Sequence, residues 1–235
     1  MKNMNEPSAG RMLGGAGDFI GPPLNAQFKA VVNFLKAHLP QFVKSILKTD
    51  ICNENGLNSR LARFITNAAS KEVFFAGSDS MEDETKGSSP AVDIGIYLSV
   101  RDIQIDPPLI TVFEGKRLTT KLPKKRSREY VIGHEEDGKH IKCGGIERFK
   151  LSIHGKNFNS AGMIGYIQDG MPDSWQLKIN SWIRDLCNQP FKLVWSENEQ
   201  LTKKETDGRI TEYSSTVNRA DSELHLTHLW IDLSS

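Results

Sequence analysis

The hydrophobic period of this chain changes from helical to extended near residue 70, and this change limits the folds open to it. Between residues 24 and 69, apolar residues recur at spacings of three and four, which predicts amphipathic helices. Pro40 is expected to interrupt the first helix, and Asn53 to cap a further helix ending at Ala69. From Glu72 onward apolar and polar residues alternate, which predicts strands. With further helices and strands later in the chain and no clear linker after residue 23, one α/β domain is the simplest interpretation.

Three strands are expected in the middle of the chain, at Glu72–Ala76, Val92–Val100 and Leu109–Leu118. The turn signal Asp106-Pro107-Pro108 leaves no room for a helix between the last two, so an antiparallel hairpin is predicted. Residues 133–145 have the composition of a loop. Later elements are predicted as helices at Ile146–Ile153, Ala161–Gln168 and Ser174–Cys187, and as strands at Phe191–Ser196, Arg209–Asn218 and Leu224–Leu233.

Composition narrows the class of protein further. The 235 residues include 30 Lys+Arg against 29 Asp+Glu, so binding of nucleic acid would require a local basic patch rather than bulk charge. No run of 18 apolar residues predicts a transmembrane helix, and the first residues lack the apolar core of a secretory signal. Three separate cysteines argue against a disulfide framework and favour a cytoplasmic protein. The glycine-rich segment 1–23 is expected to be flexible, leaving 24–235 as one domain.

Two acids and a lysine fall on neighbouring expected strands: Asp93, Glu114 and Lys116. Residues i and i+2 of a strand point to the same face, so Glu114 and Lys116 should project together. Antiparallel pairing would bring Asp93 beside Glu114, where two carboxylates repel unless a cation or proton intervenes. Oxygen ligands of this kind suit Mg²⁺ or Mn²⁺. The alternative is a solvated strand face with a surface ion pair between Glu114 and Lys116, which stabilises little.

The segments Pro90-Ala91-Val92-Asp93 and Glu114-Gly115-Lys116, separated by 20 residues, resemble the two half-motifs of the restriction-endonuclease-like nucleases. This family is known as the PD-(D/E)xK superfamily. The resemblance implies a core of the order αβββαβ, a mixed sheet flanked by helices, here followed by extra C-terminal strands. The segments from residue 53 to about 196 follow that order.

The resemblance also implies roles for individual residues. Asp93 and Glu114 would hold the catalytic Mg²⁺ or Mn²⁺, helped by the backbone carbonyl of Gly115. Lys116 would orient or activate the attacking water and steady the phosphate. In this family the helix before the first core strand often supplies another acid, for which Glu54 is the candidate.

Gln168 and a basic segment complete the expected site. Gln168 closes the expected helix Ala161–Gln168, and the resemblance places such a residue on the scissile strand or the metal's water; the alternative is an amide cap at a helix end. Seven bases and no acid occupy residues 116–128. They could follow phosphates along a groove, or form a solvated flexible loop. The nucleic-acid-binding candidates are Lys121, Lys124, Lys125, Arg126, Arg128 and Arg148.

The sequence and the resemblance together predict a metal-dependent nuclease that hydrolyses nucleic acid, DNA rather than RNA. The alternative is a catalytically silent nucleic-acid-binding or assembly subunit built on the same fold. No separate sequence-reading domain is visible, so target choice would depend on a partner subunit, a homodimer or nucleic-acid shape. The resemblance also associates such chains with bacterial antiviral defence complexes.

Overall fold

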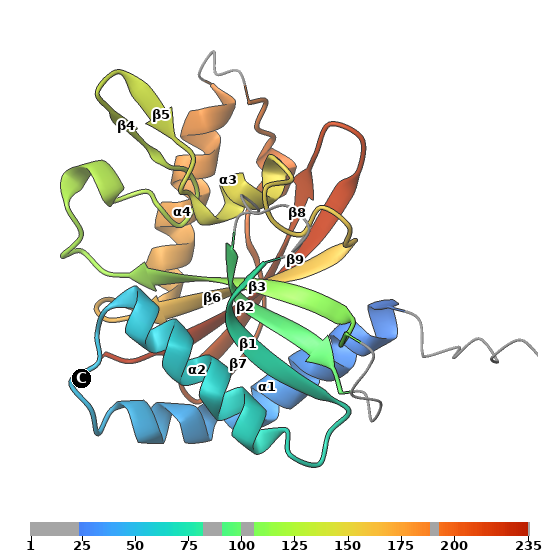
Figure 1. Ribbon diagram of the computed structural model, residues 1–235. Coiled ribbons are helices and arrows are strands. Elements are labelled where there is room, and N and C mark those ends of the chain that lie inside the picture. Colours follow the sequence, from blue (N-terminus) through green and yellow to red (C-terminus); the bar gives the residue numbers. More distant parts are fainter. Residues whose placement is uncertain (1–23, 82–90, 100–105, 189–192, 235) are drawn as a thin grey trace, which may run out of the picture.

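The computed structural model describes residues 24–81, 91–99, 106–188 and 193–234, and the predicted flexible segment 1–23 lies outside them. Helices and strands are both present and pack on one another, so the predicted α/β class is confirmed (Figure 1). The helices are α1 (Leu24–Ile46), α2 (Glu54–Ala68), α3 (Gly145–Lys150) and α4 (Pro172–Cys187), with 3₁₀ turns η1 (Lys124–Arg126) and η2 (Glu197–Glu199). The strands are β1 (Phe74–Met81), β2 (Ala91–Leu98), β3 (Leu109–Leu118), β4 (His134–Glu136), β5 (Lys139–Ile141), β6 (Ser160–Ile167), β7 (Thr202–Asp207), β8 (Ile210–Asn218) and β9 (Glu223–Asp232).

Seven of these strands form one mixed sheet in the order β1-β2-β3-β6-β9-β8-β7. The predicted hairpin of β2 and β3 is confirmed, because the two strands pair antiparallel. Strands β3, β6 and β9 are parallel neighbours, and α3 lies in the crossover from β3 to β6. The carboxyl ends of three adjacent strands therefore meet at one edge of the sheet, where ligands of α/β proteins commonly bind.

Helices cover both faces of the sheet and create two apolar cores (Figure 1). Helices α1 and α2 pack on one face, where Leu57 and Leu61 of α2 are fully buried. Helices α3 and α4 pack on the other, with Phe149 and Ile179 fully buried. The predicted N-cap of α2 is confirmed, since Asn53 Oδ1 accepts a hydrogen bond from Gly56 N at 2.8 Å.

The helix predicted at Ala161–Gln168 is wrong, because these residues form the buried strand β6. Both faces of this strand are covered, so its apolar residues do not alternate with polar ones, and periodicity cannot separate such a strand from a buried helix. The glycines of this strand allow aromatic rings of the neighbouring strands to lie close against its backbone. A Cβ on Gly162 would stand 1.9 Å from the Phe113 ring, and one on Gly165 would stand 2.4 Å from the Trp230 ring.

Other boundaries also differ from the prediction. Pro40 does not interrupt α1, which runs through it while Leu39 and Phe42 bury their side chains on the sheet. Tertiary packing thus outweighs the cost of about 3 kcal/mol for proline inside a helix. The expected loop 133–145 contains the hairpin β4–β5, whereas residues 193–196 form no strand and 191–192 lie outside the described residues. Strand β7 escaped prediction because all its residues are exposed.

A buried ion pair joins α3 to the turn η2, beside the end of strand β8. Lys150 Nζ donates to Glu199 Oε1 at 2.6 Å and to the Asn218 carbonyl at 2.9 Å. The Glu199 carboxylate also accepts from the backbone amides of Asn218 and Ser196. The ammonium lies 5.1 Å from the centre of the Trp195 ring. Because both charged groups are buried, each depends on the other for its solvation.

The buried imidazole of His228 gives this fold a testable pH dependence. Its two ring nitrogens lie 2.8 Å from the Tyr130 hydroxyl and 2.9 Å from the Ser215 hydroxyl, and no charged group contacts it among the described residues. Burial lowers the pKa of His228 to about 3. An unfolded histidine titrates near 6.5, so between these values the unfolded chain binds more protons than the folded one. The stability that neutral His228 allows is complete above pH 6.5 and is lost as the pH falls towards 3.

We therefore expect His228→Gln to flatten the acid limb of the stability curve. Between pH 7 and pH 5, His228 should cost the wild-type protein about 2 kcal/mol of unfolding free energy, a loss that the variant should not show. Urea unfolding at the two pH values measures this difference. His225→Gln, at an exposed position of the same strand, is the control and should keep the wild-type pH dependence. An equal loss in the His228 variant would contradict the prediction.

Candidate active site

The site lies where strands β2 and β3 part. Pairing between them ends at Ile94 and Phe113, although β2 continues to pair with β1 as far as Ala91. The backbone amides of β3 beyond this point therefore lack strand partners on that side. Side chains take over: Asp93 Oδ2 accepts from Gly115 N at 2.8 Å. Glu54 Oε2, from the first turn of α2, reaches Arg117 N at 3.4 Å.

Glu114, Lys116 and Glu54 form a chain of ion pairs across this opening. Lys116 Nζ lies 2.9 Å from Glu54 Oε1 and 3.0 Å from Glu114 Oε1. The Glu114 side chain is 0% exposed and the Lys116 side chain is 6% exposed. The alternative of a solvated strand face is therefore wrong. The structure brings together four of the five predicted catalytic residues, since Asp93 lies on the same strand pair and accepts from the amide of the residue between Glu114 and Lys116.

Helix α3 and the loop after it bring two further groups to Glu114. Arg148 Nη1 lies 2.8 Å from Glu114 Oε1, and His154 Nε2 lies 3.5 Å from Glu114 Oε2. Arg219 positions this loop, because its guanidinium donates to backbone carbonyls of His154 and Gly155. Arg148 was predicted to contact nucleic acid as part of a surface patch, and the structure places it instead in the wall of the site.

Glycine is required on both sides of this arrangement. A Cβ on Gly115 would stand 2.0 Å from Asn58 Oδ1 of α2, an atom already fixed by the Tyr166 hydroxyl at 2.9 Å. A Cβ on Gly145 would stand 2.5 Å from Met163 Cε and 3.3 Å from Lys116 Cγ. These close approaches set the positions of α2 and α3, and with them Glu54 and Arg148, relative to strand β3.

The electrostatics separate the two acids of the strand pair. Burial and the negative charge of Glu114 raise the pKa of Asp93 to about 7, although Lys116 partly offsets them. Burial would also raise the pKa of Glu114, but Lys116 and Arg148 outweigh it and hold that pKa below its ordinary value. The pKa of Lys116 is raised, because the charges of Glu114 and Glu54 outweigh its burial. Lys116 is thus a permanent cation beside a permanent carboxylate.

The oxygen ligands at this site suit a hard divalent cation, although only two carboxylates, Asp93 and Glu114, provide them. Glu114 Oε2 is buried and accepts no hydrogen bond, and His154 Nε2 lies 3.5 Å from it, so a cation bound to this oxygen would share it with the imidazole. Asp93 is a second carboxylate, and the positive charge of Lys116 does not fully offset the burial and the Glu114 charge that disfavour its ionised form. Within the described ranges, no group of three or more His, Cys, Asp or Glu side chains is arranged to hold a metal ion. A cation would therefore need backbone or water oxygens besides these two carboxylates.

Sequence reasoning missed Glu129, which directly follows the basic segment. Its side chain is 3% exposed, and Arg126 Nε donates to its Oε2 at 2.6 Å, whereas Oε1 is buried without a hydrogen bond. Burial and the charge of Glu54 raise the pKa of Glu129, which places this acid in the field of the site. No period marks a buried acid in a loop. His154 escaped as a site residue because its position depends on tertiary contacts with Arg219.

The remaining candidates are spread around this centre. Gln168 follows strand β6 rather than closing a helix, and its Nε2 donates to the Cys52 carbonyl at 2.5 Å. Most of the predicted basic residues have acidic partners: Lys125 with Glu136, Arg126 with Glu129, and Arg128 with Asp185. Within the described part of the chain, only Lys121 and Lys124 of the predicted basic residues have no ion pair.

Comparisons with known proteins add no evidence on the function of this site. Within the described ranges, no helix is both long and apolar enough to cross a membrane. No protein-family model matches the sequence, and neither a curated protein nor a solved structure matches the chain.

Proposed function

We propose that this protein is a metal-dependent nuclease of the restriction-endonuclease-like type, acting on DNA rather than RNA. One observation carries the proposal: a buried Lys116 lies between Glu114 and Glu54 where β2 and β3 part, with Asp93 on the adjoining strand. When the turn η1 and the separate hairpin β4–β5 are set aside, the order is α2-β1-β2-β3-α3-β6 with β3 and β6 parallel, which supports the αβββαβ core that the motif resemblance implies.

In this proposal Asp93, Glu114 and the carbonyl of Gly115 hold Mg²⁺ or Mn²⁺. The bound ion would supply Lewis-acid stabilisation of a phosphoryl oxygen and a lowered pKa for water. Lys116 holds a permanent positive charge at the same place and can donate to a phosphate oxygen or orient water. Arg148 lies on Glu114 and brings a second cation within reach of a polyanionic substrate. Glu54 fixes the Lys116 ammonium from the opposite side.

A catalytically silent nucleic-acid-binding or assembly subunit is the second candidate. The observation in its favour is that Lys116 and Arg148 already neutralise Glu114 by direct ion pairs. A purely structural network of this kind would hold α2 and α3 on the sheet without any metal. The two candidates differ in whether a divalent cation changes the stability of the protein.

Metal binding is tested by thermal unfolding with EDTA, Mg²⁺ or Mn²⁺. A ligand that binds only the folded state at 100 times its Kd stabilises by about 2.7 kcal/mol, a shift of several degrees in melting temperature. We expect this shift for the wild-type protein and none for Asp93→Asn. The variant should fold well without metal, because it removes a buried carboxylate whose ionisation is disfavoured. An unshifted wild-type melting temperature would favour the silent subunit.

Cleavage is tested on plasmid, linear and single-stranded DNA and on RNA, each with Mg²⁺, Mn²⁺ or EDTA. The proposed activity requires product only where metal is present, and loss of product with Asp93→Asn. Cleavage that persists in EDTA, or in this variant, would contradict the assignment.

A further inference from the structure

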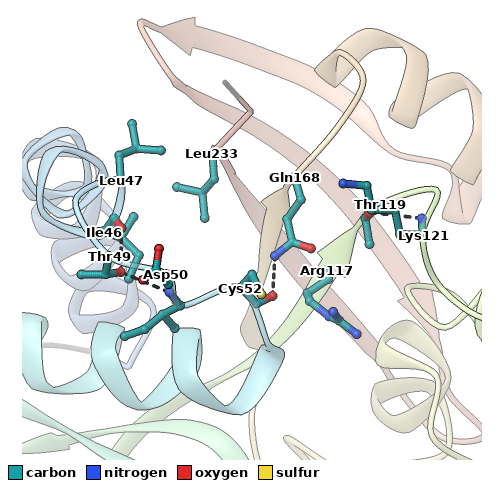
Figure 2. A pocket seen from close by; sticks show the side chains of 11 residues that line it. Ile46, Leu47, Thr49, Asp50, Cys52, Arg117, Thr119, Lys121, Gln168 and Leu233 are labelled. Atoms are coloured by element: carbon teal, nitrogen blue, oxygen red, sulfur yellow. Dashed lines mark hydrogen bonds between the residues drawn. The ribbon is translucent and has the colours of Figure 1, made fainter.

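A second feature lies next to the candidate active site, on the other face of β3. It is a pocket of about 380 Å³ at the carboxyl ends of the parallel strands β3, β6 and β9 (Figure 2). This volume is within the range of small-molecule sites, roughly 300–1,000 Å³. The end of α1 and the segment joining α1 to α2 close the opposite side. Of the predicted site residues, Gln168 and Lys121 line this pocket, whereas Asp93, Glu114 and Lys116 do not.

The two walls of the pocket differ in chemistry. Figure 2 shows Ile46 and Leu47 on the α1 side and Arg117, Thr119 and Lys121 at the strand ends, with Gln168 between them. The acid in the lining, Asp50, is on the α1 side and is exposed. An anion would therefore be repelled from the α1 side and attracted to the strand ends. An apolar ring would pack against the apolar side chains of the α1 side.

Neither cation of the strand-end wall is paired with a carboxylate among the described residues. Arg117 Nε is buried and makes no hydrogen bond, a costly state that an acceptor would relieve. Neither Arg117 nor Lys121 has a carboxylate within ion-pair distance in the described segments, although Lys121 is close enough to Asp169 to contribute to the lowered pKa of that acid. Asp169 is engaged by Thr119 Oγ1 at 2.5 Å and by the backbone amide of Thr120. The wall thus presents two free cations to the pocket.

The pocket and the candidate active site share one short stretch of β3. Lys116 and Arg117 are consecutive residues whose side chains point to opposite faces, and their Cα atoms are about 3.8 Å apart. Glu54 contacts both, through the Lys116 ammonium and the Arg117 amide. The pocket on one face of β3 is therefore separated from Lys116 on the other face by one residue of backbone and is linked to it through Glu54.

We propose that this pocket holds the terminal nucleotide of a nucleic-acid strand, with its end phosphate on Arg117 and Lys121. The inference rests on the proposed nuclease function and makes the enzyme one that recognises strand ends. The apolar side contacts the terminal base or sugar, and the cationic side binds the phosphate by charge-assisted hydrogen bonds. Cleavage then falls near the end of the strand rather than at random within it.

End recognition can be measured separately from cleavage. Fluorescence anisotropy in EDTA would compare short single strands that carry a 5′-phosphate, a 3′-phosphate or only hydroxyl ends. We expect one phosphorylated end to bind at least tenfold more tightly than the hydroxyl end. Lys121→Gln and Arg117→Gln should each reduce this ratio towards one. Lys124→Gln, an exposed base of the same segment, is the matched control and should keep the ratio even where overall affinity falls.

The outcomes separate this inference from the proposed function. Equal binding of all three ends by a protein that cleaves with Mg²⁺ would overturn the pocket assignment and leave the nuclease. A preference for one phosphorylated end without cleavage in any metal would support the pocket and overturn the nuclease. AMP distinguishes a free nucleotide from a strand end: if it raises the wild-type melting temperature while all strand ends bind equally, the strand-end assignment is overturned.

Discussion

Lys116→Ala is expected to lower the rate of phosphodiester cleavage by about two orders of magnitude or more, the scale seen when one preorganised electrostatic group is removed. The reason is the position of Lys116 Nζ, 3.0 Å from Glu114 Oε1 and nearly shielded from solvent. Metal-dependent stabilisation should survive, because the two carboxylates remain. Lys116→Arg should not restore the full rate, since the guanidinium is planar and wider than the ammonium. Single-turnover cleavage of a defined DNA substrate measures the effect.

The same experiment needs Glu114→Ala beside it. That variant should lose both cleavage and the metal-dependent shift in melting temperature, whereas Lys116→Ala should lose cleavage alone. A Lys116→Ala protein that cleaves at the wild-type rate while Glu114→Ala is inactive would remove Lys116 from the mechanism. Lys116 would then serve only to neutralise Glu114 and Glu54.

Glu199→Gln is expected to destabilise the protein by roughly 3–5 kcal/mol, the scale for breaking a buried ion pair from one side. The amide leaves the buried Lys150 ammonium without its countercharge. The two carboxylate oxygens of Glu199 together accept three hydrogen bonds, and the amide replaces one of these oxygens by an NH₂ donor. Lys150 ends α3, so the loss should also loosen Arg148 in the candidate site. Urea unfolding gives the free energy, and the cleavage rate at a temperature where the variant is folded gives the second effect.

Asp185→Asn is the matched control for that change. Its carboxylate pairs with Arg128 at 2.8 Å, but both side chains are more than one third exposed. An exposed pair of this kind contributes about 0–1 kcal/mol. If the two variants lose the same free energy, burial of the Lys150–Glu199 pair is not what makes it important.

The sequence was sufficient for those elements whose pattern depends on one covered face. The period of α2 follows from packing on a single side, and the bounds of α2 and β2 were both predicted within a few residues. Strand β6 was mistaken for a helix because it is covered on both faces, so no period remained to identify it. Strand β7 was missed for the opposite reason, since it covers nothing. Strand β3 is also buried along most of its length, yet its bounds were predicted, because the turn at 106–108 and the basic segment after it limit the strand. The sequence therefore resolves an element where burial is one-sided or where clear signals flank it.

The candidate site divides in the same way. The i, i+2 relation of Glu114 and Lys116 is local, and two adjacent strands suffice to add Asp93. Glu129, Arg148 and His154 depend on where the segment 119–155 folds back over the sheet, which no local spacing encodes. Their signal was present only as charge: a buried acid and two basic groups in a segment otherwise assigned to the surface.

The parting of β2 and β3 gives the acids of the site a duty that does not involve chemistry. Asp93 and Glu54 serve as surrogate strand partners for the amides of Gly115 and Arg117. A descendant that lost its activity would still be under selection to keep these acids, because an apolar replacement would leave a backbone donor unsatisfied. Lys116 shares this duty, because its ammonium holds the Glu54 carboxylate that accepts from the Arg117 amide. Among relatives of this chain, retention of these acids and of the lysine would therefore report the opened sheet edge and not, by itself, activity.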